Sequence, residues 1–359
     1  MTQVEASFIL FHSKEITVRM SMQLQWNSVK MFVFIFLIHS NAVLGQKPET
    51  ILRQASVQTL LTIGVEKKTI LYQPVQVQTD AQGNIYVLDI GDYRVKKFDS
   101  SGRQIAQWSR RGHGPDEFQA PARMFVASDG LVYVADVPNA RITVFSSEGK
   151  YLRTVRTRGV GMMGIIVTDR RAIIMAGYGD SLLYEYDLDG ALVRKWGEPL
   201  APPPASSFLH QGTITTDGKD NLFLSFVFSS KIVAYSVGGH FLYTIDGPIV
   251  VANSQFRPRR VGGNLVTGMT GEEVFASWGI AADSTQLYSL FSGKSSKEHQ
   301  NDAVNCELLH VYSKRDGVYR HTLRLPFSAR SMHYDGRAFY FIVDEDQPVV
   351  KKCLLGLQR

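Results

Sequence analysis

The chain contains the stretch Gly83-Asn-Ile-Tyr-Val-Leu-Asp89 and, further along, its near copy Gly130-Leu-Val-Tyr-Val-Ala-Asp136. Each stretch is followed by a second alternating run, Arg94-Val-Lys-Lys-Phe98 or Arg141-Ile-Thr-Val-Phe145, and then by a glycine, Gly102 or Gly149. The tyrosines, arginines and glycines of the two copies are all 47 positions apart. Three independent markers at one period indicate a structural repeat.

Each repeat has the pattern of four short strands. Alternation of apolar and polar residues predicts the strands, while glycine and Xaa-Gly pairs predict tight turns between them. An antiparallel meander of four strands is the blade of a β-propeller. The frequent aromatic and glycine residues, with 20% charged residues, also suit many short strands better than helices.

The tyrosine-to-glycine spacing identifies further blades. Tyr86 and Tyr133 lie 16 residues before Gly102 and Gly149, and the same spacing recurs in three further pairs: Ile174/Gly190, Phe223/Gly239 and Tyr340/Gly356. A sixth copy, beginning at Tyr288, is interrupted by a polar insertion from Ser292 to Asn305. The last copy lacks a fourth strand, which the N-terminal segment Ser56–Ile63 can supply. The sequence therefore predicts an all-β fold over residues 46–359, a six-bladed β-propeller of four-stranded antiparallel blades whose ring is closed by an N-terminal strand.

Residues 74–157 resemble NHL repeats. The linker Gly112-His-Gly-Pro-Asp-Glu-Phe-Gln-Ala-Pro121 is similar to the segment that joins repeats in that family, and Asp89/Arg94 and Asp136/Arg141 match its Asp and Arg positions. We expect both pairs to be structural and to fasten the loop between the second and third strands. The other four blades lack these pairs. The resemblance implies an exported bacterial propeller that binds ligands or proteins, although some related propellers are hydrolases or lyases with a metal in the channel.

The N-terminal region predicts export. Lys30 precedes the apolar run Met31–Ile38, and small residues follow at Val43 and Gly45, as in a signal peptide. We assign residues 1–45 to this region, with translation starting at Met1, Met20 or Met22, and expect a periplasmic or secreted protein. The run is too short for a stable membrane span in the mature chain. An uncleaved anchor is the alternative interpretation.

Net charge and cysteine content limit the classes of partner, disulfide and metal site that we expect. The net charge of +6 is mild and spread along the chain, so nucleic acid is an unlikely partner, and the export signal argues against it further. The two cysteines, Cys306 and Cys353, are expected to be separate buried thiols, with one disulfide as the alternative. No Cys or His spacing typical of a zinc site is present.

A candidate site follows from the repeat register. The position ten residues before the second-strand marker falls where the innermost strand begins, near the channel mouth. Read around the ring, that position holds Gln76, Arg123, Gly164, Thr213, Trp278 and Arg330. Two guanidinium groups near an aromatic ring suit a carboxylate, sulfate, phosphate or acidic sugar. His113, in the glycine-rich linker, is a further candidate. Alternatively, Arg and Trp fill the channel, or a one-residue shift points them elsewhere.

These features favour an exported, non-enzymatic binding platform that recognises a protein, a peptide or an anionic glycan on the rim and channel mouth. The ligand-binding candidates are Arg123, Trp278, Arg330, Gln76 and His113, and no cofactor or metal ligand set is expected. The alternative is a metal-dependent hydrolase or lyase with Ca or Zn in the central channel.

Overall fold

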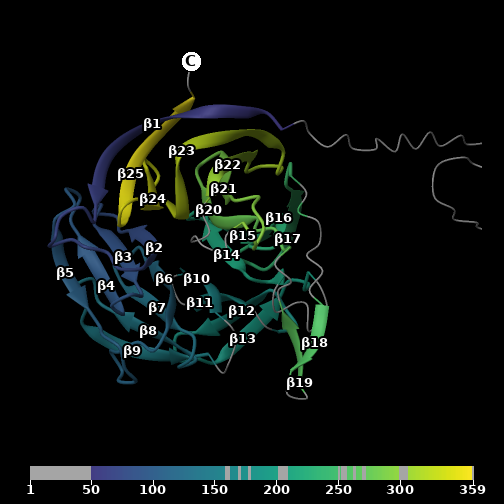
Figure 1. Cartoon of the computed structure of the whole chain (residues 1–359). Helices are drawn as coiled ribbons and strands as arrows, with labels where there is room; N and C mark the ends of the chain where they lie inside the picture. Colours follow the sequence, from purple (N-terminus) through teal and green to yellow (C-terminus); the bar gives the residue numbers. More distant parts are fainter. Residues whose placement is uncertain are drawn as a thin grey trace, which may run out of the picture. The chain divides into compact units, whose positions relative to one another are not determined.

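The computed structural model describes residues 50–157, 162–168, 171–176, 179–200, 209–249, 251, 257–261, 264–268, 272–298 and 306–357. The predicted signal peptide lies outside the described residues. The assigned elements are 25 β-strands, and most of them form antiparallel meanders that follow one another around a common axis in chain order (Figure 1). The predicted six-bladed β-propeller is confirmed.

Blades 1 to 4 are separate four-stranded sheets, each with its strands in chain order. Blade 1 contains β2 (Pro74–Thr79), β3 (Ile85–Asp89), β4 (Arg94–Phe98) and β5 (Gln104–Trp108); blade 2 contains β6 (Pro121–Val126), β7 (Val132–Asp136), β8 (Arg141–Phe145) and β9 (Tyr151–Arg156). Blade 3 contains β10 (Met162–Thr168), β11 (Arg171–Ala176), β12 (Leu183–Asp187) and β13 (Leu192–Trp196); blade 4 contains β14 (Gly212–Thr216), β15 (Asn221–Phe226), β16 (Ser229–Ser236) and β17 (Phe241–Asp246).

Blades 5 and 6 share a strand. The 16-residue β23 (Tyr319–Tyr334) is the outer strand of blade 5 in its first half and the innermost strand of blade 6 in its second half. The remaining strands are β20 (Ser277–Ala282), β21 (Gln286–Phe291) and β22 (Cys306–Ser313) in blade 5, β24 (Phe339–Asp344), β25 (Pro348–Leu357) and β1 (Leu52–Ile63) in blade 6, and a separate hairpin of β18 (Arg257–Val261) and β19 (Asn264–Gly268) between blades 4 and 5 in the sequence.

The N-terminal strand β1 closes the ring, as predicted, but it is longer than the sequence indicated. Ala55 to Ile63 pair antiparallel with β25, and Leu52 to Gln54 continue in parallel along β23. Gly356 therefore lies in a strand opposite Ser56 and not in a turn. The repeat spacing that ends at Gly356 is kept in blade 6, but its turn is replaced by pairing with β1.

The recurring tyrosine has a structural cause. In three blades its hydroxyl donates a hydrogen bond to an aspartate in the turn between the first and second strands, and that aspartate also accepts backbone N–H groups of the turn. The pairs are Tyr86–Asp80 at 2.9 Å, Tyr288–Asp283 at 2.7 Å and Tyr340–Asp335 at 2.8 Å. Burial and the neighbouring carboxylate raise the pKa of all three tyrosines. The sequence marker thus records a hydrogen bond that locks each turn to its blade.

Apolar side chains fill the space between neighbouring blades. Trp108, at the end of blade 1, lies against Tyr86 of its own blade and Phe145 of blade 2, with ring centroids 6.3 and 6.1 Å apart. Gly149 passes so close to this indole that a Cβ atom would lie 2.5 Å from it, and its φ of +85° also favours glycine. The repeated glycine therefore serves both the turn and the contact between blades.

The two ends of the ring differ in their loops. The connection rim carries the inter-blade connections and the loops between second and third strands, such as 109–120 and 90–93. The turn rim carries the turns between first and second and between third and fourth strands, such as 80–84 and 99–103. Cys306 and Cys353 are buried and both are free thiols.

Candidate binding site at the channel mouth

The predicted site residues all lie on, or lead into, the innermost strands, at their connection-rim ends. Gln76, Arg123, Gly164 and Thr213 occupy equivalent places, opposite the second strands of blades 1 to 4. In blades 5 and 6 the equivalent residues are Gly279 and Ser331. Trp278 and Arg330 lie one position earlier, where a β-bulge interrupts the pairing, so their side chains leave the strand in a different direction.

The side chain of Gln76 accepts a hydrogen bond from the backbone of the next blade. Its Oε1 accepts a hydrogen bond from the Met124 N–H at 2.7 Å, and Gln78 does the same for Val126, also at 2.7 Å. The innermost strand of each blade is a sheet edge, so N–H and C=O groups on its channel side have no partner within the blade. The two glutamines cover that edge of β6 and link blade 1 to blade 2.

Arg123 also binds backbone groups, here carbonyls, through its charged guanidinium. Its Nε donates to the Met163 carbonyl of blade 3 at 2.7 Å, and its Nη1 to the neighbouring Ala122 carbonyl at 2.8 Å. Nη2 makes a longer contact of 3.5 Å with the Gly212 carbonyl of blade 4. Arg123 forms no ion pair with any described residue, and burial lowers the pKa of its guanidinium group. A desolvated cation without a carboxylate is costly unless another anion compensates it.

Arg330 and Trp278 have local partners. The Nε of Arg330 lies 2.8 Å from Oδ2 of Asp344, the last residue of β24 in the same blade, and about a fifth of the arginine side chain is exposed. Trp278 packs against Phe275 with ring centroids 5.7 Å apart, beside the buried Phe228. Its indole nitrogen is buried and has no hydrogen-bond partner among the described residues.

His113 is exposed on the connection between blades 1 and 2. Its loop is held by Glu117, whose carboxylate accepts the Gly114 N–H at 2.9 Å and pairs with Arg110 at 2.7 Å. From blade 2, Arg141 donates to the carbonyls of Gly114 and Glu117 at 2.7 and 2.6 Å. The loop is therefore rigid on the blade side and presents His113 to solvent.

The two predicted Asp/Arg pairs differ from each other. Asp136 accepts the N–H groups of Gln119 and Ala120 at 3.0 and 2.8 Å, and lies 3.7 Å from Arg141. Asp89 likewise accepts the N–H groups that precede β2, but its ion pair within the described chain is with Lys96 at 2.7 Å and not with Arg94.

The expected ion pair between Asp89 and Arg94 is therefore not the one formed in the described chain, because Lys96, two positions further along β4, occupies the carboxylate instead. Both aspartates fasten the entry into the innermost strand.

Sequence reasoning missed Gln78, Thr79 and Asp344 as contributors to this channel wall. Gln78 repeats the role of Gln76 two positions on, and the alternation of β2 is a signal that could have found it. Thr79 and His333 share a hydrogen bond of 3.0 Å between blades 1 and 6, and burial lowers the pKa of His333 to about 4. Asp344 was missed because nothing in the repeat marks it.

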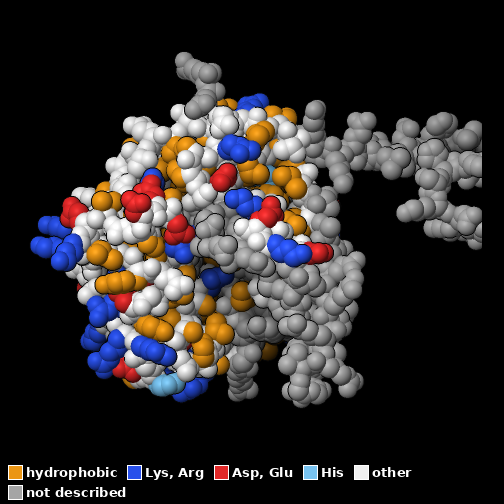
Figure 2. All heavy atoms as spheres, viewed as in Figure 1, with side chains coloured by type: hydrophobic (Ala, Val, Ile, Leu, Met, Phe, Trp, Pro, Cys, Tyr) orange, Lys and Arg blue, Asp and Glu red, His pale blue; other side chains and the backbone are white. Residues whose placement is uncertain are grey.

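Gln76 and Arg123 lie on β2 and β6, the innermost strands of blades 1 and 2. Trp278 and Arg330 lie on β20 and β23, the innermost strands of blades 5 and 6. No hydrogen bond or ion pair within the described segments joins one pair to the other. Figure 2 shows a hollow near the middle of the ring with a Lys or Arg side chain at its floor. Within the same segments, no group of three His, Cys, Asp or Glu residues could hold a metal ion, and no helix is long and apolar enough to cross a membrane.

Comparisons with known proteins support the fold. Residues 66–162 match the profile of a family described as a 6-bladed beta-propeller, DUF5128. That match spans blades 1 and 2, the same region that carries the NHL resemblance, and the NHL assignment itself stays a prediction. No curated protein sequence matches the chain.

Several solved structures share the architecture at low identity. A member of the DUF4221 family from Bacteroides vulgatus is 11% identical with a TM-score of 0.57, covering 85% of this chain and 99% of its own. A putative exported protein from Bacteroides fragilis is 8% identical with a TM-score of 0.57, covering 86% and 99%. Virginiamycin B lyase from Staphylococcus aureus is 11% identical with a TM-score of 0.51, covering 84% and 100%. Such distant similarity defines a β-propeller and no activity.

Proposed function

We propose that this protein is an exported binding platform that takes an acidic group of a protein, peptide or glycan ligand at the channel mouth. The observation that carries the proposal is Arg123, a half-buried guanidinium on an innermost strand with no ion-pair partner among the described residues. A guanidinium has five N–H donors, and three of them contact carbonyls here, which leaves two for a ligand.

The other predicted site residues support recognition more than chemistry. Trp278 and Arg330 lie at the connection-rim ends of two other innermost strands, where they add an aromatic side chain and a second, partly exposed cation. Ligand pockets combine apolar walls with a few convergent polar groups. The alternative, a metal-dependent hydrolase or lyase, would need a ligand set that the described residues do not gather. Export rests on the signal-peptide pattern, and the B. fragilis protein described as exported has the same fold.

The test compares binding of acidic and neutral probes. A pentaglutamate peptide and a pentagalacturonate oligosaccharide are titrated into the protein by calorimetry at low salt, with maltopentaose as the neutral control. Loss of one desolvated charge–charge contact weakens binding by roughly tenfold or more. We therefore expect Arg123→Gln and Arg330→Gln each to weaken binding of at least one acidic probe by this factor.

The matched control is Arg103→Gln, which removes an equally charged but exposed side chain on the turn rim. Thermal unfolding of each variant establishes that it is folded. The proposal fails if a folded Arg123→Gln variant binds the acidic probes as the parent protein does, if Arg103→Gln weakens binding equally, or if the parent protein binds neither probe.

A further inference from the structure

The turn rim of blade 5 contains a cavity unrelated to the channel mouth. It has a volume of about 340 Å³ and is lined by residues 284–286, in the turn between β20 and β21, by residues 313–315, in the turn between β22 and β23, and by Arg320. Its lining includes the hydroxyl residues Ser284, Thr285 and Ser313, and three cations, Lys314, Arg315 and Arg320. No carboxylate is among the lining residues. We refer to it as the blade-5 turn pocket.

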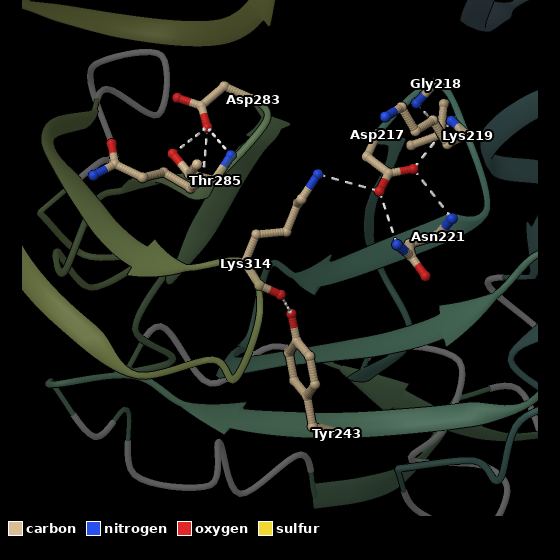
Figure 3. Close-up of polar contacts among 10 residues, drawn as sticks. Asp217, Gly218, Lys219, Asn221, Tyr243, Asp283, Thr285 and Lys314 are labelled. Atoms are coloured by element: carbon tan, nitrogen blue, oxygen red, sulfur yellow. Dashed lines mark hydrogen bonds and ion pairs between the residues drawn. The ribbon is translucent and has the colours of Figure 1, made fainter.

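The framework of the pocket is fixed through Lys314. Its Nζ lies 3.2 Å from Oδ2 of Asp217 in blade 4, its N–H donates to the Thr285 carbonyl at 2.8 Å, and its carbonyl accepts from the Tyr243 hydroxyl. Figure 3 shows Lys314 reaching from its turn toward Asp217, with Tyr243 below it. Asp217 is itself held by Asn221 through the side-chain amide at 2.8 Å. The turn that carries Arg315 is thus anchored on two blades before any ligand binds.

The guanidinium groups of the two arginines in the pocket have unused hydrogen-bond donors. Arg315 and Arg320 are exposed, and neither forms an ion pair or hydrogen bond with another described residue. The nearest charge of opposite sign is Asp316, whose pKa is lowered by a hydrogen bond from Ser313, by the Val318 N–H and by the charges of Arg320 and Arg315. Because Asp316 already accepts these bonds, it leaves most guanidinium donors available.

The positive lining of the blade-5 turn pocket differs from that of a second turn-rim cavity. The comparable cavity between blades 1 and 2, of about 310 Å³, is formed by the same kinds of turn. Its charged residues are Asp80, Asp129 and Glu148 with the single cation Lys97. The fold repeats the cavity but not its charge, so the cation cluster does not follow from blade geometry.

We propose that the blade-5 turn pocket binds the phosphate or sulfate group of a monoester. Two guanidinium groups present planar pairs of donors that match tetrahedral oxyanions, while Lys314, through its ion pair with Asp217, holds the turn that carries Arg315. The cavity is large enough for a single sugar or side chain bearing that group. This site is distinct from the channel mouth and does not depend on the function proposed there.

Glucose 6-phosphate and glucose 6-sulfate serve as probes, with glucose as the neutral control, and binding is measured by titration calorimetry. We expect saturable binding of one or both esters and none of glucose, and a preference between them identifies the source of the oxyanion. The double variant Arg315→Gln/Arg320→Gln is expected to weaken ester binding by roughly tenfold or more. Both side chains are exposed, so the fold should be unaffected.

One control variant locates the effect. Arg103→Gln, on the same rim at blade 1, is expected to leave ester binding within about twofold of the parent protein. Three results overturn the proposal: no saturable binding of either ester, unchanged binding in the double variant, or an equal loss in Arg103→Gln, which would reveal only diffuse attraction to a basic protein.

Discussion

Acid is expected to weaken this propeller through His310. The imidazole is 1% exposed, its ring centroid is 4.6 Å from that of Phe291, and its Nδ1 lies 2.7 Å from the Thr322 hydroxyl. Its Nε2 has no hydrogen-bond partner among the described residues, so nothing there stabilises a proton. Burial accordingly lowers the pKa of His310 from 6.5 to about 3.

Proton linkage gives the direction and the size of this effect of pH on the free energy of unfolding. Between pH 6.5 and about 3 the unfolded chain binds a proton at His310 that the folded chain does not, so this contribution is complete above pH 6.5 and declines as the pH falls. One pH unit in that window corresponds to about 1.36 kcal/mol. At pH 4, which is about 2.5 units below the unfolded pKa, the free energy of unfolding should have fallen by about 3 kcal/mol from this residue alone.

The assay is urea unfolding, followed by tryptophan fluorescence at pH 7, 5.5 and 4. His310→Asn retains a polar atom for Thr322 but does not titrate, and it should be less stable than the parent at pH 7 by about 1–3 kcal/mol because the ring leaves a cavity. We expect that gap to close by about 3 kcal/mol at pH 4. His240→Asn, at an exposed histidine, is the control and should keep a constant gap. A gap that stays constant for His310→Asn would refute the reasoning.

Three further predictions concern the framework. Asp136→Ala should lower the free energy of unfolding by about 3–5 kcal/mol in urea titrations, because the N–H groups of Gln119 and Ala120 lose the buried Asp136 carboxylate as their acceptor; a change under about 1 kcal/mol would contradict this. Tyr340→Phe should cost about 2 kcal/mol by removing the hydrogen bond to the Asp335 carboxylate, and an unchanged melting temperature would show that the turn does not need it. Deletion of residues 50–63 should leave β25 unpaired and produce aggregation, visible in size-exclusion chromatography; a monodisperse, folded product would refute the closing role of β1.

Much of the fold could be predicted because its signals are local. Tyr86 and Gly102 recur for physical reasons, a hydrogen bond to a turn aspartate and a positive φ, and both reasons act within one blade. The pairing of β1 with β25 could be inferred because a missing fourth strand must be supplied from somewhere. The continuation of β1 along β23 could not, because it depends on where two blades meet and not on any sequence pattern.

Less of the candidate site than of the fold could be predicted from the sequence. Counting ten residues back from the marker placed Gln76 and Arg123 on paired positions of their strands, because the turns 80–84 and 127–131 have the same length. The turns 283–286 and 335–338 are one residue shorter, so the same count falls one position early in blades 5 and 6, on the bulge residues Trp278 and Arg330. Nor could it indicate that Gln76 binds the Met124 N–H, because that contact joins blades 48 residues apart. The blade-5 turn pocket required Lys314 and Asp217 to be seen together across two blades.

The pairing of β1 with β25 also determines when the molecule can finish folding. Ala55 pairs with Leu357, so the first strand to be synthesised has to wait for the last one. Bringing together ends about 300 residues apart costs about 5 kcal/mol of chain entropy before any contact compensates for it. Contacts of such long range slow folding, so the growing chain keeps an open edge until its final residues are available.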